Sequence, residues 1–173
     1  MTNPLEDLSK IVNDLDLEFL SGLGHFLSFQ KTPIKTTCTQ IIDSGAVQYF
    51  VQYLDPTYIE QYCQIRKTNN EPTYPSKMNV ITMQQLYALQ YEVTWCITNV
   101  VGGTSDHTKY MVEMGCVPLL INLLTSDDCE LRRHSARAIA NIAGDSPVMR
   151  DYVNEMGVMK HLLKLVEIKP CQP

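Results

Sequence analysis

Two side chains of different chemistry share one helical face in the stretch TWCITNVVGGTSDHT, residues 94–108. Trp95 and Asn99 are four residues apart, and residues at that spacing lie on the same side of an α-helix. An indole face attracts cations, and a side-chain amide both donates and accepts hydrogen bonds. The glycine pair Gly102 and Gly103 follows at once and predicts that the helix ends there. The stretch therefore predicts a helix that presents two binding groups and then stops.

The same landmarks recur 42 residues further along the chain. Asn99 lies in ITNVVGGTS and Asn141 in IANIAGDSP, and they are 42 residues apart. Gly115 in VEMGCVPLLINLL and Gly157 in NEMGVMKHLLKLV have the same separation. Two landmarks with one period, and apolar positions that match between them, define a repeat of about 42 residues, a length typical of armadillo and HEAT repeats.

Each repeat unit is predicted to contain three helices. Ser105 is the expected N-cap of a short helix that ends at Gly115, and Pro118 lies near the first turn of a second helix. A third helix, capped by Ser126 or Asp127, runs to about residue 143.

The next unit begins with Ser146 and Pro147, which start a short helix in the same way. Three glycines are interpreted as helix ends, with left-handed backbone or a close approach of neighbouring chain: Gly102, Gly103 and Gly144.

An earlier and less regular unit precedes these repeats. The stretch IIDSGAVQYFVQYL, residues 41–54, places Gly45 where the later unit has Gly115, but 70 residues before it, so an insertion is expected between them. We predict a degenerate first repeat at 1–54 with a helix at about 15–29, an insertion loop at 55–82 with a helical turn near 58–65, a second repeat at 83–125, a third at 126–167 and a tail at 168–173. The predicted fold is an all-α, right-handed armadillo-type α-solenoid of about three repeats, whose third helices line the concave side.

Composition excludes several classes of protein. The chain has 173 residues, a net charge of −5 and no apolar run near the roughly 18 residues of a membrane span, so neither nucleic acid nor membrane is an expected partner. No nucleophile–base pair, metal-ligand spacing or phosphate loop is recognisable, which argues against an enzyme and against a bound cofactor or metal. The six cysteines show no paired spacing and are expected to be reduced thiols.

The stretches YEVTWCITNVVGGTSDHTKYMVEMGCVPLLINLL and ARAIANIAGDSPVMRDYVNEMGVMKHLLKLV together resemble the armadillo domain of importin-α. This resemblance implies an adaptor that binds basic nuclear localisation signals in extended form along its groove, and that works in the cytoplasm and nucleus. It also implies the set of peptide-binding positions: Glu92, Trp95, Asn99, Gly103, Thr108, Arg137, Asn141 and Asp145. In that family, Gly103, Thr108 and Asp145 would offer three oxygens to one cargo ammonium group.

The chain departs from the family pattern at two places. Arg137 stands where the resemblance implies a second tryptophan, so weaker or altered binding of cargo is expected. Residues 1–30 contain one basic residue, Lys10, so the basic arm that docks on importin-β in this family is expected to be missing. Importin-β and export factors therefore follow as partners only from the resemblance.

Structural alternatives remain open for the same residues. Trp95 is a candidate core residue, and the two asparagines are candidate helix bridges. Asp145 precedes a helix start, where a carboxylate satisfies free N–H groups. Arg132, Arg133 and Arg137 are a candidate solvated face near the acidic residues at 127–130. The alternative function is an armadillo interaction scaffold that has lost cargo binding, and the chain is either a complete short protein or part of a longer one.

Overall fold

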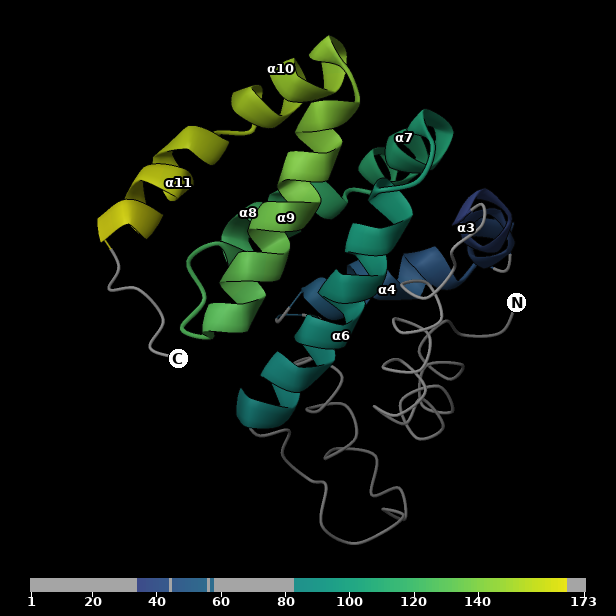
Figure 1. Ribbon diagram of the computed structural model, residues 1–173. Helices are drawn as coiled ribbons and strands as arrows, with labels where there is room; N and C mark the ends of the chain where they lie inside the picture. The colour runs from purple at the N-terminus through teal and green to yellow at the C-terminus, as the bar shows by residue number, and fades with distance from the viewer. Residues whose placement is uncertain (1–33, 44, 56, 58–82, 168–173) are drawn as a thin grey trace, which may run out of the picture.

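The computed structural model describes residues 34–43, 45–55, 57 and 83–167, and every regular element among them is an α-helix (Figure 1). The predicted all-α class is thus confirmed. In chain order the helices are α3 (Ile34–Asp43), α4 (Ala46–Leu54), α6 (Met83–Val101), α7 (Ser105–Glu113), α8 (Cys116–Leu123), α9 (Cys129–Asp145), α10 (Pro147–Glu155) and α11 (Val158–Glu167). The helix predicted at about 15–29 and the helical turn predicted near 58–65 lie outside the described residues.

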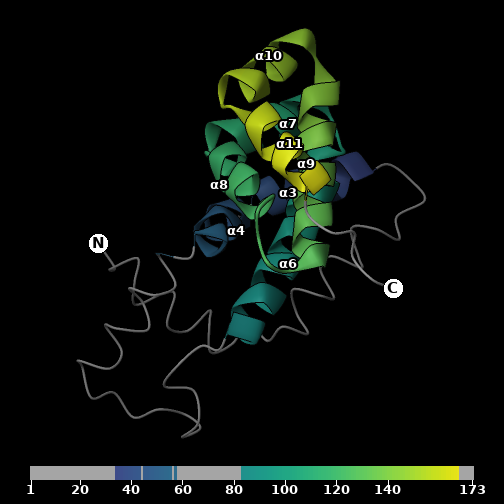
Figure 2. The same cartoon turned by 90° about the vertical axis from the view of Figure 1, so that its left-hand side faces the viewer.

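Two short helices followed by one long helix form a pattern that occurs twice. Helices α3 and α4 have 10 and 9 residues and precede α6 with 19; α7 and α8 have 9 and 8 and precede α9 with 17. The long helices α6 and α9 pack side by side (Figure 1). Figure 2 shows α4 and α8 on one side of the stack and α6 and α9 on the other. The equivalent helices of consecutive units therefore lie in register.

The repeat is marked by glycines in left-handed backbone conformation. Gly45, Gly115 and Gly157 have φ angles of 74°, 83° and 81°, and each separates the first short helix of a unit from the second. Such φ values are strained for residues with a Cβ atom, which explains why glycine recurs at this point. In Gly115 and Gly157 the N–H donates to a carbonyl three residues earlier, at 2.9 Å in both.

The other three glycines are expected to end a helix with left-handed backbone or a close approach, and α6 does end at Val101, directly before Gly102 and Gly103. Among the described residues only the three glycines above have positive φ, and Gly102, Gly103 and Gly144 do not. Gly102 and Gly103 do meet the expectation of close approach. A Cβ would lie 3.3 Å from Nδ2 of Asn141 at Gly102, and 2.7 Å from Nδ1 of His107 at Gly103. Gly144 meets neither, because α9 continues through it to Asp145 and a Cβ would find open space.

The N-cap of α7 lies one residue earlier than predicted. Thr104, rather than Ser105, is the N-cap, because its hydroxyl accepts the His107 N–H while Nδ1 of His107 accepts the Thr104 N–H at 3.3 Å. Since Nδ1 is an acceptor, Nε2 carries the hydrogen and donates to Oγ1 of Thr39 at 3.0 Å. The cap thus also ties α7 to α3.

Helix α9 is capped by Asp128, and the prediction of Ser126 or Asp127 is wrong. The Asp128 carboxylate accepts the Leu131 N–H at 2.8 Å, while Oγ of Ser126 accepts the Asp128 N–H at 3.2 Å. The sequence SDD offers three capping groups in a row, and the packing of the preceding loop decides among them. The predicted start of α10 is confirmed, with Ser146 as N-cap and Pro147 at the first position.

The core runs through all the described helices and includes three cysteines. Cys38, Cys96 and Cys116 are buried free thiols, and burial raises the pKa of both Cys96 and Cys116 to about 12. Cys129 is disulfide-bonded, so the expectation of six reduced thiols is wrong for this residue. Cys129 is half-buried at the start of α9, and the irregular spacing of cysteines along the chain does not reveal its pairing.

Candidate functional site

One stripe of α6 is less buried than the rest of the helix. Glu92, Trp95 and Asn99 are spaced three and four residues apart and are half-buried, whereas Ile97 and Val100 on the opposite side are fully buried. The Trp95 ring also lies at 6.5 Å from the ring of Tyr91, tilted by 48°. Trp95 is therefore a partly accessible aromatic side chain at the surface of α6, and not a residue of the core.

The matching stripe of α9 carries Arg137 and Asn141. Arg137 is exposed, and Asn141 is half-buried. Nδ2 of Asn141 donates to the backbone carbonyl of Thr98 at 3.2 Å, which joins α9 to α6. The bridging role that the sequence left open is thus present for Asn141. It uses one amide hydrogen, and within the described residues the side-chain oxygen and the second hydrogen make no further hydrogen bond.

The three residues expected to form an ammonium pocket differ in their accessibility. Gly103 is exposed and Asp145 is half-buried, but Thr108 is 1% exposed. The Thr108 hydroxyl donates to the carbonyl of Val101 at 3.1 Å and so satisfies the end of α6. The structure therefore places Thr108 inside the junction between α6 and α7, and leaves Gly103 and Asp145 as the accessible members of the set.

Asp145 is not required as a helix cap. It is the last residue of α9, and the cap of α10 is Ser146, whose Oγ accepts the Met149 N–H at 3.2 Å. Across the described ranges the only ion pairs are Lys109–Glu113 and Glu130–Arg133. Within the described residues the Asp145 carboxylate therefore makes no ion pair.

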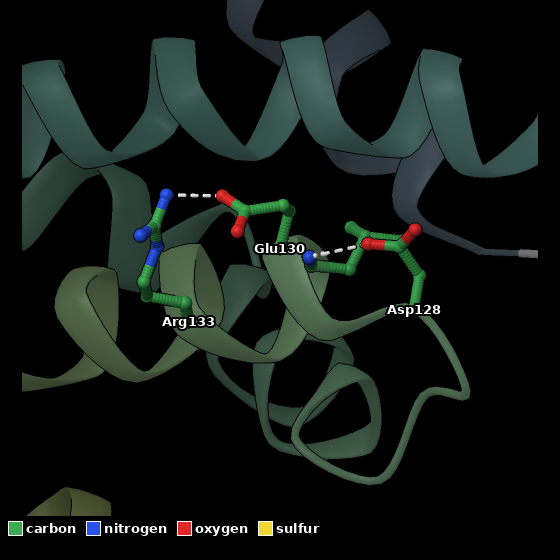
Figure 3. A network of polar contacts seen from close by, with 4 residues as sticks. Asp128, Glu130 and Arg133 are labelled. Atoms are coloured by element: carbon green, nitrogen blue, oxygen red, sulfur yellow. Dashed lines mark hydrogen bonds and ion pairs between the residues drawn. The ribbon is translucent and has the colours of Figure 1, made fainter. Parts of the chain in front are cut away.

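The three arginines of α9 have different environments. Arg132 donates to the carbonyls of Ser126 and Asp127 at 2.7 and 3.0 Å and so holds the loop before the helix. Figure 3 shows Arg133 paired with Glu130 one turn earlier, beside the Asp128 cap. Arg137 makes no ion pair within the part of the chain that the structure describes. The interpretation as a solvated face near the acidic residues therefore holds for Arg133, and Arg132 has a structural role.

A cavity at the N-terminal ends of α6 and α9 was not predicted from the sequence. It has a volume of about 440 Å³ and is lined by Tyr87, Ala88, Tyr91, Asp128 and Glu130. Burial raises the pKa of Tyr91, and the neighbouring Glu92 raises it further. Tyr87, Tyr91 and Trp95 follow one another at intervals of four positions, and this spacing is the sequence signal that indicates the aromatic stripe.

Beneath this cavity, Tyr91 contacts His134 edge-on, with ring centroids 4.8 Å apart. Burial lowers the pKa of His134, as do the nearby Arg137 and Arg133. The described residues contain no group of three or more side chains able to hold a metal ion. Nor does this part of the chain include a helix of the length and apolarity needed to cross a membrane.

The fold and the repeated face define the class of protein. The armadillo/β-catenin-like repeat matches residues 104–144, which include α7, α8 and all but the last residue of α9. An engineered protein of known structure superposes with a TM-score of 0.67 at 22% identity, over 98% of this chain and 58% of its own. A designed armadillo repeat protein superposes with a TM-score of 0.64 at 19% identity, over 87% of this chain and 50% of its own. The chain therefore has an armadillo-repeat fold, and the predicted armadillo α-solenoid is confirmed.

The sequence relatives are importin-α subunits. Importin subunit alpha-6 of Arabidopsis thaliana is 31% identical over 150 residues, which are 87% of this chain and 22% of that protein. Importin subunit alpha-1b of Oryza sativa subsp. japonica is 36% identical over 124 residues, which are 70% of this chain and 23% of that protein. The predicted resemblance to the importin-α family is thus confirmed. The chain spans less than a quarter of the length of these two relatives. The repeat boundaries at 83 and 126 stay predictions, since the matched repeat crosses the second of them.

Proposed function

We propose that this chain binds basic peptide segments, of the kind that act as nuclear localisation signals, in extended conformation across the face formed by α6 and α9. In this proposal it acts as an importin-α-like adaptor in nuclear protein import, in the cytoplasm and nucleus. The observation that carries the proposal is the half-buried stripe of Glu92, Trp95 and Asn99 on α6, together with the Asp145 carboxylate at the end of α9. One oxygen of Glu92, Oε2, is buried.

The chemistry of these groups suits a lysine-rich ligand. The face of an indole attracts a cation by about 0.5–2 kcal/mol, and the Glu92 carboxylate lies one turn before Trp95. An extended peptide has unpaired N–H and C=O groups, which the amides of Asn99 and Asn141 match as donors and acceptors. The net charge of −5 favours the approach of a basic segment.

The partners follow in order of support. Basic segments of cargo proteins are the proposed ligands of the α6–α9 face. Contacts with importin-β and with export factors rest on the family resemblance alone, and they are the part of the proposal with the least support.

A second candidate function is an armadillo interaction scaffold that no longer binds basic cargo. Two observations favour it. Arg137 brings a cation to the middle of the face, and the hydroxyl of Thr108 is used within the fold at the end of α6. Both reduce the number of groups that attract a lysine side chain.

Binding of a fluorescein-labelled lysine-rich peptide, measured by fluorescence polarisation at moderate salt, separates the two functions. We expect the wild-type protein to bind at micromolar concentration or tighter, and Asp145→Lys to weaken binding by at least about tenfold, because it replaces an attraction by a like-charge contact. Asp151→Lys, on the exposed side of α10, makes the same change of net charge and is expected to leave binding unchanged. If neither wild type nor Asp151→Lys binds while both are folded by circular dichroism, the proposed binding of basic peptides is wrong and the scaffold function is favoured.

A further inference from the structure

Arg137 holds, in the following repeat, the place that Trp95 holds on α6. The two residues are 42 positions apart, as are Asn99 and Asn141, and each precedes its asparagine by four residues. Helices α6 and α9 pack side by side (Figure 1), and Asn141 donates to the carbonyl of Thr98, which precedes Asn99. Because Trp95 and Arg137 each lie one turn before these asparagines, the two positions lie at matching heights on neighbouring helices. One repeat thus presents an aromatic ring at this height, and the next presents a guanidinium group.

The guanidinium of Arg137 is available to a ligand, unlike those of its two neighbours on α9. Arg132 is held by two backbone carbonyls, and Arg133 is paired with Glu130. Arg137 is exposed, and within the described ranges it takes part in no hydrogen bond or ion pair.

Asp145 is too far from Arg137 to neutralise it. Asp145 lies two turns further along α9, which is about 12 Å at a rise of 1.5 Å per residue. This exceeds the screening length of about 8 Å at physiological ionic strength. Each of the two groups therefore acts on its own part of a bound ligand. His134, one turn before Arg137, adds no competing charge at neutral pH, since its pKa is lowered by burial and by Arg137 itself.

We propose that the segment recognised by this face carries mixed charge: basic residues for Trp95, Glu92 and Asp145, and one acidic residue that pairs with Arg137. A guanidinium binds a carboxylate through two parallel hydrogen bonds, so an aspartate or glutamate is the matching side chain. This inference rests on the proposed peptide binding and specifies its ligand. Packed helices lie about 8–10 Å apart and an extended chain advances about 3.3 Å per residue, so the acidic residue stands about three residues from the one at Trp95.

The test uses a family of labelled peptides and four forms of the protein. A lysine-rich peptide is made with Glu, Ala or Lys at each position two to four residues to either side of one central lysine. Binding of each peptide is measured by fluorescence polarisation to wild type, Arg137→Glu, Arg137→Trp and Lys160→Glu. Lys160 is exposed on α11, away from the α6–α9 face, and its substitution makes the same change of net charge as Arg137→Glu.

We expect one position at which the Glu peptide binds wild type about tenfold more tightly than the Lys peptide. Relative to the Ala peptide, Glu should bind about threefold more tightly and Lys about threefold more weakly. Arg137→Glu reverses the order, Arg137→Trp removes the preference for Glu, and Lys160→Glu keeps the wild-type order. If lysine-rich peptides bind wild type but no position prefers Glu, or if Arg137→Glu keeps the preference, the mixed-charge inference is wrong and the proposed function stands. If no peptide of any pattern binds any form of the protein, both are wrong.

Discussion

Gly115 and Gly144 provide a direct test of why glycine recurs in this repeat. A Cβ atom added at either position meets nothing within 4 Å, so neither substitution causes a clash. The two differ in backbone conformation: Gly115 has a φ of 83°, and Gly144 lies within α9 without positive φ. Alanine at the two positions therefore separates the effect of left-handed backbone from that of packing.

The expected free energies have opposite sign. Left-handed backbone costs a residue with a Cβ about 1–2 kcal/mol, and the reduced freedom of the unfolded chain returns about 0.4–1 kcal/mol, so Gly115→Ala destabilises by about 1 kcal/mol. Gly144→Ala has no such cost and stabilises by about 0.5–1 kcal/mol. The two variants thus differ by about 1.5–2 kcal/mol.

Thermal unfolding followed by circular dichroism at 222 nm measures this difference. For a chain of this size, 1 kcal/mol shifts the melting temperature by about 2–4 °C, so the two variants should melt about 3–8 °C apart. Gly115→Asn serves as the control, because asparagine adopts left-handed backbone more readily than alanine and should recover part of the loss. Equal melting temperatures for the two alanine variants would refute the conformational explanation of the repeat glycines.

Three further predictions follow from the caps, the arginines and the buried histidine. Thr104→Ala should lower the free energy of unfolding by about 1 kcal/mol, whereas Ser105→Ala, at the position that follows the cap, should change it by less than about 0.5 kcal/mol; equal effects in urea denaturation would argue against the observed cap. Arg132→Ala should lower the free energy of unfolding more than Arg133→Ala, because the second variant removes only an exposed ion pair worth about 0.2–1 kcal/mol. The reverse order in the same assay would contradict the role of Arg132 in holding the loop before α9. The pKa of His134 is lowered in the folded state, so the unfolded chain binds more protons below pH 6.5. The free energy of unfolding should therefore fall as the pH drops through this range, and it should fall less in His134→Gln. An equal fall in both proteins would exclude His134 as the cause.

Much of the fold follows from local patterns in the sequence. The 42-residue period, the short and long helices and the start of α10 at Ser146 and Pro147 all follow from apolar spacing and capping residues. Which glycines take left-handed backbone did not follow. Gly144 looks like a helix end in the sequence, but α9 continues through it. The choice depends on where the chain must turn to stack the next helix, and this is a property of the packed units.

For the candidate face, too, some features follow from the sequence and others only from the tertiary structure. The sequence by itself determined that Glu92, Trp95 and Asn99 share one stripe, because their spacing along a single helix places them on one side. Only the tertiary structure decided that Asn141 bridges to Thr98, that Thr108 is enclosed and that Arg137 alone among its neighbours remains available. The first outcome depends on a contact between residues 43 positions apart in the chain, and the second on the junction between α6 and α7. Such contacts arise when α6, α7 and α9 pack together, and no local pattern of residues specifies which polar atoms that packing satisfies.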